Sequence, residues 1–344
     1  MPPFLSICIP TYNRIDRLKK LVLNILCSPL QDIEIVVLDN CSTDDTLNIL
    51  NEINDDRLFV YSNNENIGGI LNGFIALKYC KGRYSILCLD KDWINIEWLT
   101  EFTNVLKKND NIVTGYCNLN ITDKADHVLF HAGFEALSNL AYLSKHPSGD
   151  FYRTEKYKNL DILDKLIFEN KTFPFLIELI NAELAYRGDG LLVNIPLITT
   201  ENIEDAAKSK SKTYTSKDCF FFPNQRIKEY CKYILHVSSL PITKKEKRKL
   251  IKRIFRQGFL SCTIGYKNIM KNNILLWHYS INQKRLFFND FIYYTYKYFK
   301  SFLILNIYMD KIEKILFIVE QNIYLCLKLF MYVLIKKMYF QNNN

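Results

Sequence analysis

Short apolar runs and amphipathic stretches alternate along the first part of the chain. The apolar runs cover residues 5–9, 33–38, 58–61 and 85–89, and each has the length of one strand. Between them, apolar residues recur at helical spacing within residues 18–26, 47–53 and 71–77. This order predicts an α/β domain with a mostly parallel sheet flanked by helices.

The run at residues 85–89 is followed by two carboxylates one residue apart, Asp90 and Asp92. Side chains alternate between the two faces of a strand, so the two carboxylates would point the same way if the strand continued through them. Paired oxygen donors suit Mg²⁺ or Mn²⁺, which also bind substrate phosphates. Taken alone, an Asp-x-Asp tripeptide fits an ordinary solvated turn after a strand better than a metal site.

Two other predicted strands also end in polar residues. Pro10-Thr11-Tyr12 follows the first strand, and Asp39-Asn40 follows the second. Ligands bind parallel α/β sheets outside the carboxyl ends of the strands. We therefore expect these segments and the Asp90–Asp92 pair to line one crevice, which favours a metal and phosphate site over a solvated turn.

Four segments that include these strand ends, residues 9–14, 37–44, 66–72 and 89–92, resemble the family-2 glycosyltransferases of the GT-A (Rossmann-like) fold in order and spacing. The resemblance is strong over about the first 125 residues and weak over residues 145–200. It implies an inverting, metal-dependent transfer of a sugar from a nucleoside diphosphate to an acceptor hydroxyl.

The resemblance also implies roles for particular residues. Asp90 would lie near the ribose and Asp92 would bind the metal, although Trp93 replaces an acidic residue that the family often has there. In the family, the aspartate after the second strand helps to hold the nucleotide base, and Asp39 could accept a hydrogen bond from the imide N–H of uracil or thymine. The choice of a UDP-sugar as donor is what the resemblance implies. The donor-binding residues expected from these segments are Pro10, Thr11, Tyr12, Arg14, Asp39, Asn66, Gly68 and Asp90.

The acceptor side is less clearly marked in the sequence. Residues 173–187 read as a helix with Pro174 near its start and Gly188 after its end, and in the family an acidic pair at this place supplies the catalytic base. Here there is no pair; Glu178 stands at a suitable distance from Gly188, with Glu183 and Asp150 as alternatives. A base is needed because a sugar hydroxyl is a weak nucleophile until its proton is removed.

The segments around this helix have simpler expected structures. Residues 111–116 and 191–196 read as strands, the latter at a sheet edge, and residues 146–153 read as a loop that enters a strand or helix. Residues 200–215 are rich in Lys and Ser and read as a loop, either closing over the donor phosphates or simply solvated.

From residue 224 onward the chain becomes basic and aromatic. Residues 226–344 carry 22 Lys+Arg against 6 Asp+Glu, and residues 244–256 combine dense positive charge with apolar residues on one side. We expect a catalytic domain at 1–223 and a helical region at 224–344 that lies on an anionic membrane surface. A helical bundle on the catalytic domain or a dimer interface is the alternative. Residues 315–335 favour an in-plane helix over a membrane span.

Together these features predict a cytoplasmic enzyme, peripheral on the inner face of the cell membrane, that extends a lipid-linked glycan such as lipooligosaccharide or capsule. The scattered cysteines and the absence of a secretory signal before residue 4 fit that location. We see no nucleic-acid-binding motif. The alternatives are an inactive membrane-bound scaffold and a nucleotidyltransferase, whose usual Gly-rich, basic first loop is replaced here by Pro10-Thr11-Tyr12-Asn13-Arg14.

Overall fold

The structure is a computed structural model that describes residues 2–121, 126–161, 164–165, 175–201, 222–278 and 288–325. The chain divides into two compact units, residues 1–202 and 203–344. The boundary expected between residues 223 and 224 stays a prediction, because residues 202–221 lie outside the described part.

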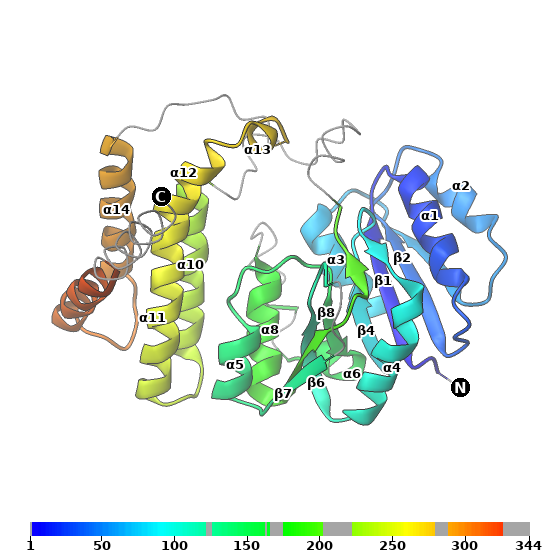
Figure 1. The fold of residues 1–344 in the computed structure, drawn as a ribbon, viewed down its shortest axis with the longest axis horizontal. Helices are drawn as coiled ribbons and strands as arrows, with labels where there is room; N and C mark the ends of the chain where they lie inside the picture. Colours follow the sequence, from blue (N-terminus) through cyan, green and yellow to red (C-terminus); the bar gives the residue numbers. More distant parts are fainter. Residues whose placement is uncertain are drawn as a thin grey trace, which may run out of the picture. The chain divides into compact units, whose positions relative to one another are not determined.

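The first unit contains an eight-stranded sheet in the order β3-β2-β1-β4-β8-β6-β9-β7 (Figure 1). Its strands are β1 (Leu5–Thr11), β2 (Ile33–Asp39), β3 (Leu58–Ser62), β4 (Tyr84–Leu87), β6 (Ile112–Cys117), β7 (Asp126–Phe130), β8 (Asp150–Arg153) and β9 (Asp189–Asn194). The pairings β1–β2, β2–β3, β1–β4 and β6–β9 are parallel, whereas β8 and β7 pair antiparallel with their neighbours. The mostly parallel sheet expected from the sequence is confirmed.

Helices flank this sheet, as the alternating pattern predicts. They are α1 (Ile15–Leu26), α2 (Thr46–Asn51), α3 (Gly69–Tyr79), α4 (Leu99–Lys108), α5 (Phe134–Leu140), α6 (Thr154–Lys158) and α8 (Leu176–Arg187), with a short 3₁₀ turn, η1 (Ile96–Trp98). Every residue of β1 and β2 is buried, which explains why these strands are mostly apolar and do not alternate with exposed polar residues. The buried stripe of α1, Leu18, Leu21, Val22 and Ile25, is the stripe that its sequence spacing predicts.

Two strand predictions were wrong in a way that matters for the site. β4 ends at Leu87, and the N–H of Asp92 donates to the carbonyl of Leu89 (3.0 Å), so Asp90 and Asp92 lie in a turn and do not share a strand face. This turn leads into β5 (Trp93–Ile94), which pairs with β10 (Ile198–Thr199) in a separate sheet.

The strand expected at an edge of the sheet is β9, which instead lies between β6 and β7. Pro196 follows the end of β9, so its missing N–H does not interrupt the hydrogen bonds between the strands.

The second unit is helical, as expected. It consists of α10 (Pro223–Ser239), α11 (Lys244–Leu260), a π-helical turn η2 (Ser261–Gly265), α12 (Tyr266–Ile269), α13 (Asn273–His278), α14 (Phe288–Leu303) and a helical stretch at residues 311–325. Phe255 of α11 packs against Tyr298 and Phe302 of α14 and against Phe317. A capping box of Thr243 and Glu246 starts α11.

None of the helices in the described ranges combines the length and the apolar composition needed to cross a membrane. Residues 326–335 of the stretch considered for membrane contact lie outside those ranges.

Candidate functional site

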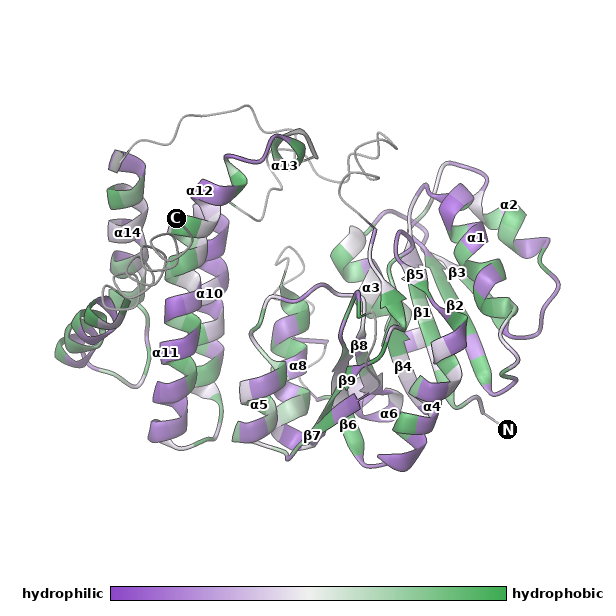
Figure 2. Ribbon diagram, in the orientation of Figure 1, coloured by the Kyte–Doolittle hydropathy of each residue, from purple (hydrophilic) through white to green (hydrophobic). Residues whose placement is uncertain are grey.

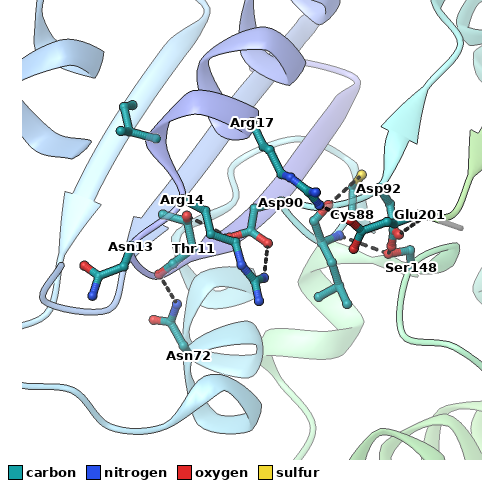
Figure 3. Close-up of polar contacts among 12 residues, drawn as sticks. Thr11, Asn13, Arg14, Arg17, Asn72, Cys88, Asp90, Asp92, Ser148 and Glu201 are labelled. Carbon is teal, nitrogen blue, oxygen red and sulfur yellow. Dashed lines mark hydrogen bonds and ion pairs between the residues drawn. The ribbon is translucent and has the colours of Figure 1, made fainter. Parts of the chain in front are cut away.

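The carboxyl ends of β1 and β4 meet at the carboxylate of Asp90 (Figure 3). Oδ2 of Asp90 accepts a hydrogen bond from Oγ1 of Thr11 (2.9 Å), the last residue of β1, and Oδ1 accepts one from Nη1 of Arg14 (2.7 Å). Asp90 is 3% exposed, so its charge lies largely outside water. The two contacts compensate for that burial, because a buried carboxylate needs a charged or hydrogen-bonding partner. Asp90, Thr11 and Arg14 therefore come together at the strand ends, where the ligand crevice was expected.

Asp39, the last residue of β2, has its carboxylate directed to neighbouring protein groups. It is fully buried and accepts hydrogen bonds from the backbone N–H (2.9 Å) and hydroxyl of Ser42 and from Oγ of Ser62 (3.3 Å). Tyr12 differs from it, because its ring is 41% exposed beside the same strand ends. Tyr12 is thus accessible at the surface, whereas Asp39 holds the loop that follows β2.

An asparagine network joins the loops after β1, β2 and β3. Nδ2 of Asn40 donates to Asn66 (2.9 Å), Nδ2 of Asn63 donates to Asn40 (3.1 Å) and to Asn72 (2.8 Å), and Nδ2 of Asn72 donates to the carbonyl of Leu38 (2.9 Å). The network reaches the backbone of the turn before α3, because Oδ1 of Asn66 also accepts from the N–H of Gly68 (2.9 Å).

Gly68 itself has φ +86°, a left-handed conformation that favours glycine. Asn66 and Gly68 therefore shape one side of the crevice. Pro10 is buried within β1. Its ring lies close to Gly73 of α3, because a Cβ added at Gly73 would be 3.8 Å from Cγ of Pro10.

Asp92 faces a different set of groups from Asp90. Its Oδ2 accepts a hydrogen bond from the hydroxyl of Ser148, its Oδ1 accepts one from the backbone N–H of Glu201 (3.1 Å), and Nδ1 of His146 lies 3.6 Å from Oδ2. Its side chain is fully buried by these neighbours. Figure 3 shows Ser148 and Glu201 at Asp92, and Arg14 and Thr11 at Asp90. The turn after β4 thus directs its two carboxylates to different partners.

The loop that carries His146 and Ser148 is held in place by Glu178 in the first turn of α8. Oε2 of Glu178 accepts a hydrogen bond from the N–H of Leu143 (3.0 Å) and Oε1 accepts one from the N–H of Lys145 (2.9 Å). Glu178 is 1% exposed. The predicted base therefore has its charge stabilised by two backbone donors and lies beneath the loop that contacts Asp92.

The two alternative carboxylates differ in their surroundings. Glu183 lies on α8 and pairs with Arg187 one turn later. Asp150, at the start of β8, is 1% exposed; its Oδ1 accepts from Nδ2 of Asn181 (2.9 Å), and its Oδ2 has no hydrogen-bond partner. Burial raises the pKa of Asp150 to about 7, the charge of Lys145 lowers this pKa, and the nearby Glu178 raises it. Asp150 is therefore the carboxyl group here that can exchange a proton near neutral pH.

The donor groups at Asp90 and Asp92 fit a divalent cation only if a substrate contributes further ligands. Among the described residues there is no group of three or more His, Cys, Asp or Glu that could hold a metal ion. Mg²⁺ and Mn²⁺ are commonly held by one or two carboxylates together with substrate phosphates and water. Asp92, and Asp90 beside it, supply carboxylates of that kind.

Several residues of the site were not anticipated from the sequence. Residues 146–153 were expected to form a loop that leads into a strand or helix. The contacts of His146 and Ser148 with Asp92 were not predicted. Repeated Asn at the strand ends, at residues 40, 63, 66 and 72, was the available signal for the network. Of the Lys-rich segment 200–215, only residues 200 and 201 are described, and the backbone of Glu201 touches Asp92.

We predict that Asp150 makes folding stability depend on pH. Its pKa is higher in the folded protein than its ordinary value of 3.8, so the folded state keeps the proton while the unfolded chain loses it. Asp150 should therefore lower the free energy of unfolding by roughly 4 kcal/mol as pH rises from about 4 to above 7. The amide of Asp150→Asn does not titrate, so the stability of this variant relative to wild type should rise across that interval in urea unfolding.

The exposed Asp45→Asn serves as the control for this comparison, since it removes a carboxylate that burial does not affect. Wild type and Asp150→Asn with parallel pH profiles would contradict the prediction.

Comparisons with known proteins agree with the geometry. Residues 6–161 match the family model described as glycosyl transferase family 2. WfaP of Escherichia coli, a UDP-Glc:alpha-D-GlcNAc-diphosphoundecaprenol beta-1,3-glucosyltransferase, is 31% identical over 179 residues, which are 50% of this chain and 64% of WfaP. TuaG of Bacillus subtilis, a putative teichuronic acid biosynthesis glycosyltransferase, is 34% identical over 26% of this chain and 36% of its own length.

The fold has solved counterparts as well. A crystal structure of S. aureus TarS 1-349 in complex with UDP-GlcNAc superposes with a TM-score of 0.56 at 16% identity and covers 87% of this chain and 81% of that one. The first three curated relatives are matched over 40–64% of their own lengths. The family match over residues 6–161 and the shared fold support a family-2 glycosyltransferase domain with a GT-A-like fold, similar to bacterial surface-glycan transferases.

Proposed function

We propose that the protein transfers a sugar from UDP to a hydroxyl of a lipid-linked glycan, with inversion at the anomeric carbon and with a divalent metal ion. The observation that carries the proposal is the contact of Asp90 with Thr11 and Arg14, which forms a polar crevice at the strand ends where α/β sheets bind ligands. The printed activity of WfaP, with a UDP-Glc donor and a diphosphoundecaprenol-linked acceptor, supports the choice of substrates.

The donor would bind along the ends of β1, β2 and β4. Tyr12 offers an exposed side chain against which a uracil base can stack. For Asp39 to accept from the imide N–H, its contacts with Ser42 and Ser62 would have to be exchanged. Arg14 adds a positive charge beside Asp90, where the ribose is expected. The remaining donor-side residues, Pro10, Thr11, Asn66 and Gly68, would shape the backbone around the nucleotide.

Asp92, with Asp90 beside it, would hold Mn²⁺ or Mg²⁺. When bound, the cation supplies Lewis-acid stabilisation of the negative charge that develops on the departing diphosphate. For Asp92 to reach a ligand, its present contacts with Ser148 and the backbone of Glu201 must be exchanged. These contacts keep the carboxylate oriented while the donor is absent.

The acceptor hydroxyl attacks the anomeric carbon as the bond to the diphosphate breaks, and its proton passes to a carboxylate base. Glu178 remains the predicted base, with Asp150 and Glu183 as alternatives. Glu178 is engaged by two backbone N–H groups, whereas the raised pKa of Asp150 suits proton exchange near neutral pH. Substitution of Glu178 and of Asp150 can therefore distinguish which of the two acts as the base.

We further propose that the protein works at the inner face of the cell membrane, because a lipid-linked acceptor such as a lipooligosaccharide or capsule precursor is presented there. A membrane-bound scaffold without activity is the competing function; the missing acidic pair near Glu178 is its support. The family match argues against the nucleotidyltransferase alternative. A homo-oligomer built from the helical unit also stays a prediction.

We predict that purified protein hydrolyses or transfers from a UDP-sugar only when Mn²⁺ or Mg²⁺ is present, and that Asp92→Asn abolishes this metal-dependent turnover. The amide keeps the size of the side chain but removes the charge that binds the cation. A panel of nucleotide sugars assayed with Mn²⁺ and with EDTA measures both effects, and Asp56→Asn, an exposed carboxylate on the surface, is the control. Protein that neither binds nor cleaves any nucleotide sugar would favour the scaffold.

We predict that Glu178→Gln lowers transfer roughly a hundredfold or more while UDP binding survives, as expected for loss of a general base. Transfer and UDP binding are measured side by side with Asp150→Asn and with the exposed control Glu155→Gln. Normal transfer in Glu178→Gln together with a loss in Asp150→Asn would assign the base to Asp150. A fall in melting temperature and UDP binding in Glu178→Gln would instead show that it only supports the loop at residues 143–145.

A further inference from the structure

The helical stretch at residues 311–325 carries large aliphatic side chains on two opposite sides. One side packs into the second unit, with Lys314, Phe317, Ile318, Gln321 and Leu325 buried. The other side bears an exposed apolar stripe of Ile312, Ile315, Leu316, Val319 and Ile323, which are 69%, 46%, 61%, 50% and 58% exposed. These positions follow helical spacing, so their side chains form one continuous row. The opposite face of the helix already packs against the second unit, so the exposed apolar stripe does not contribute to the packing of the helix.

Positive charge lies directly beside this stripe. Arg248 and Lys252 of α11 both pair with Glu320, and Nε of Arg256 donates to Gln321 (2.7 Å) while its guanidinium lies 3.4 Å from the ring centroid of Tyr324. Glu320 and Tyr324 follow Val319 and Ile323 in the sequence, on the flank of the stripe. The basic side of α11 therefore borders the C-terminal part of the apolar stripe, at residues 320–324.

That basic side extends beyond these contacts. α11 contains eight Lys or Arg and one Glu, and its exposed Lys245 and Lys249 share a face with Lys252 and Arg256 at helical spacing. In Figure 2, hydrophilic colour alternates with hydrophobic colour along α11. An aliphatic row bordered by Lys and Arg is the arrangement of helices that lie in the plane of an anionic membrane.

The charge distribution also decides between possible occupants of the stripe. A second copy in a two-fold dimer would bring its own basic α11 toward the first, which costs electrostatic energy. Residues 326–344 contain three Lys and no Asp or Glu, so they too would add positive charge. An anionic lipid surface complements both the apolar row and the charge.

We propose that the stripe Ile312–Ile323, together with the basic side of α11, is the surface by which the helical unit lies on an anionic lipid leaflet. The inference rests on the proposed lipid-linked acceptor, since it describes how the enzyme stays at the membrane that presents it. The aliphatic side chains enter the acyl-chain boundary, and the Lys and Arg side chains contact lipid phosphates.

The test is flotation of the full-length protein with vesicles of phosphatidylcholine alone and of phosphatidylcholine with phosphatidylglycerol. Wild type should bind the anionic vesicles more strongly, and added salt should weaken that binding. The double variant Leu316→Gln/Val319→Gln should bind roughly tenfold more weakly, because two apolar anchors are lost. The matched control Leu23→Gln/Leu235→Gln changes two leucines that are 42% and 39% exposed elsewhere, and it should bind like wild type.

A second variant, Lys245→Gln/Lys249→Gln, should lose the preference for anionic lipid. The inference is overturned if wild type binds neither vesicle, or if the stripe variant binds as well as wild type. It is also overturned if the stripe variant changes the mass of the protein in light scattering, which indicates a second copy. A melting temperature altered in the stripe variant and not in its control indicates packing within the chain.

Transfer to a water-soluble acceptor is measured in parallel for all these variants. The stripe variant should retain it, whereas absence of transfer in wild type would refute the proposed function and leave the vesicle result standing on its own.

Discussion

The bond between the carboxylate of Asp90 and its two partners, Thr11 and Arg14, is the constraint on which the rest of the site depends. An ionised carboxylate that is 3% exposed is costly to bury, and a charge-assisted hydrogen bond at 2.7 Å with a hydroxyl at 2.9 Å compensates that cost. Because Thr11 ends β1 and Asp90 follows β4, the same contact fixes the turn after β4. The direction of Asp92 follows from that turn.

A second group of buried polar contacts supports Asp92 from the other side. The loop between α5 and β8 contains Tyr142, Ser144 and Gly149 at positive φ, conformations that are costly for the first two residues. Glu178 compensates by accepting two backbone N–H groups of this loop, and the loop in turn brings Ser148 to Asp92. The carboxylates of Asp92 and Glu178 are thus linked through one loop, and a change at either one affects the other.

Much of the fold could be predicted from the sequence because its elements have clear periodic patterns. The strands β1 and β2 are continuous apolar runs and α1 has a helical stripe, so their residues determine both type and position. Asp90 and Asp92 were correctly predicted to follow a strand, but their shared direction was wrong, because β4 ends three residues before Asp90 and a turn intervenes. The interior place of β9 depended on β7, a short strand with mostly exposed residues and an apolar run of only three residues, 128–130.

The contacts of the acceptor side were beyond sequence reasoning for a different reason. Ser148 and His146 reach Asp92 across more than fifty residues of chain, and Glu178 reaches the same loop from α8. Such long-range contacts depend on the packing of β8 beside β4, and no local sequence pattern predicts them. The strand-end residues of the donor side could be predicted because parallel strands bring their carboxyl ends to one edge.

A crystal structure of the protein grown with UDP and Mn²⁺ tests the central claim most directly. The account predicts the uracil at Tyr12 and Asp39, the ribose beside Asp90, and the metal ion between Asp92 and the diphosphate, with the contacts of Asp92 to Ser148 and Glu201 exchanged. UDP bound away from the ends of β1, β2 and β4, or a metal ion that does not contact Asp92 or Asp90, would contradict it.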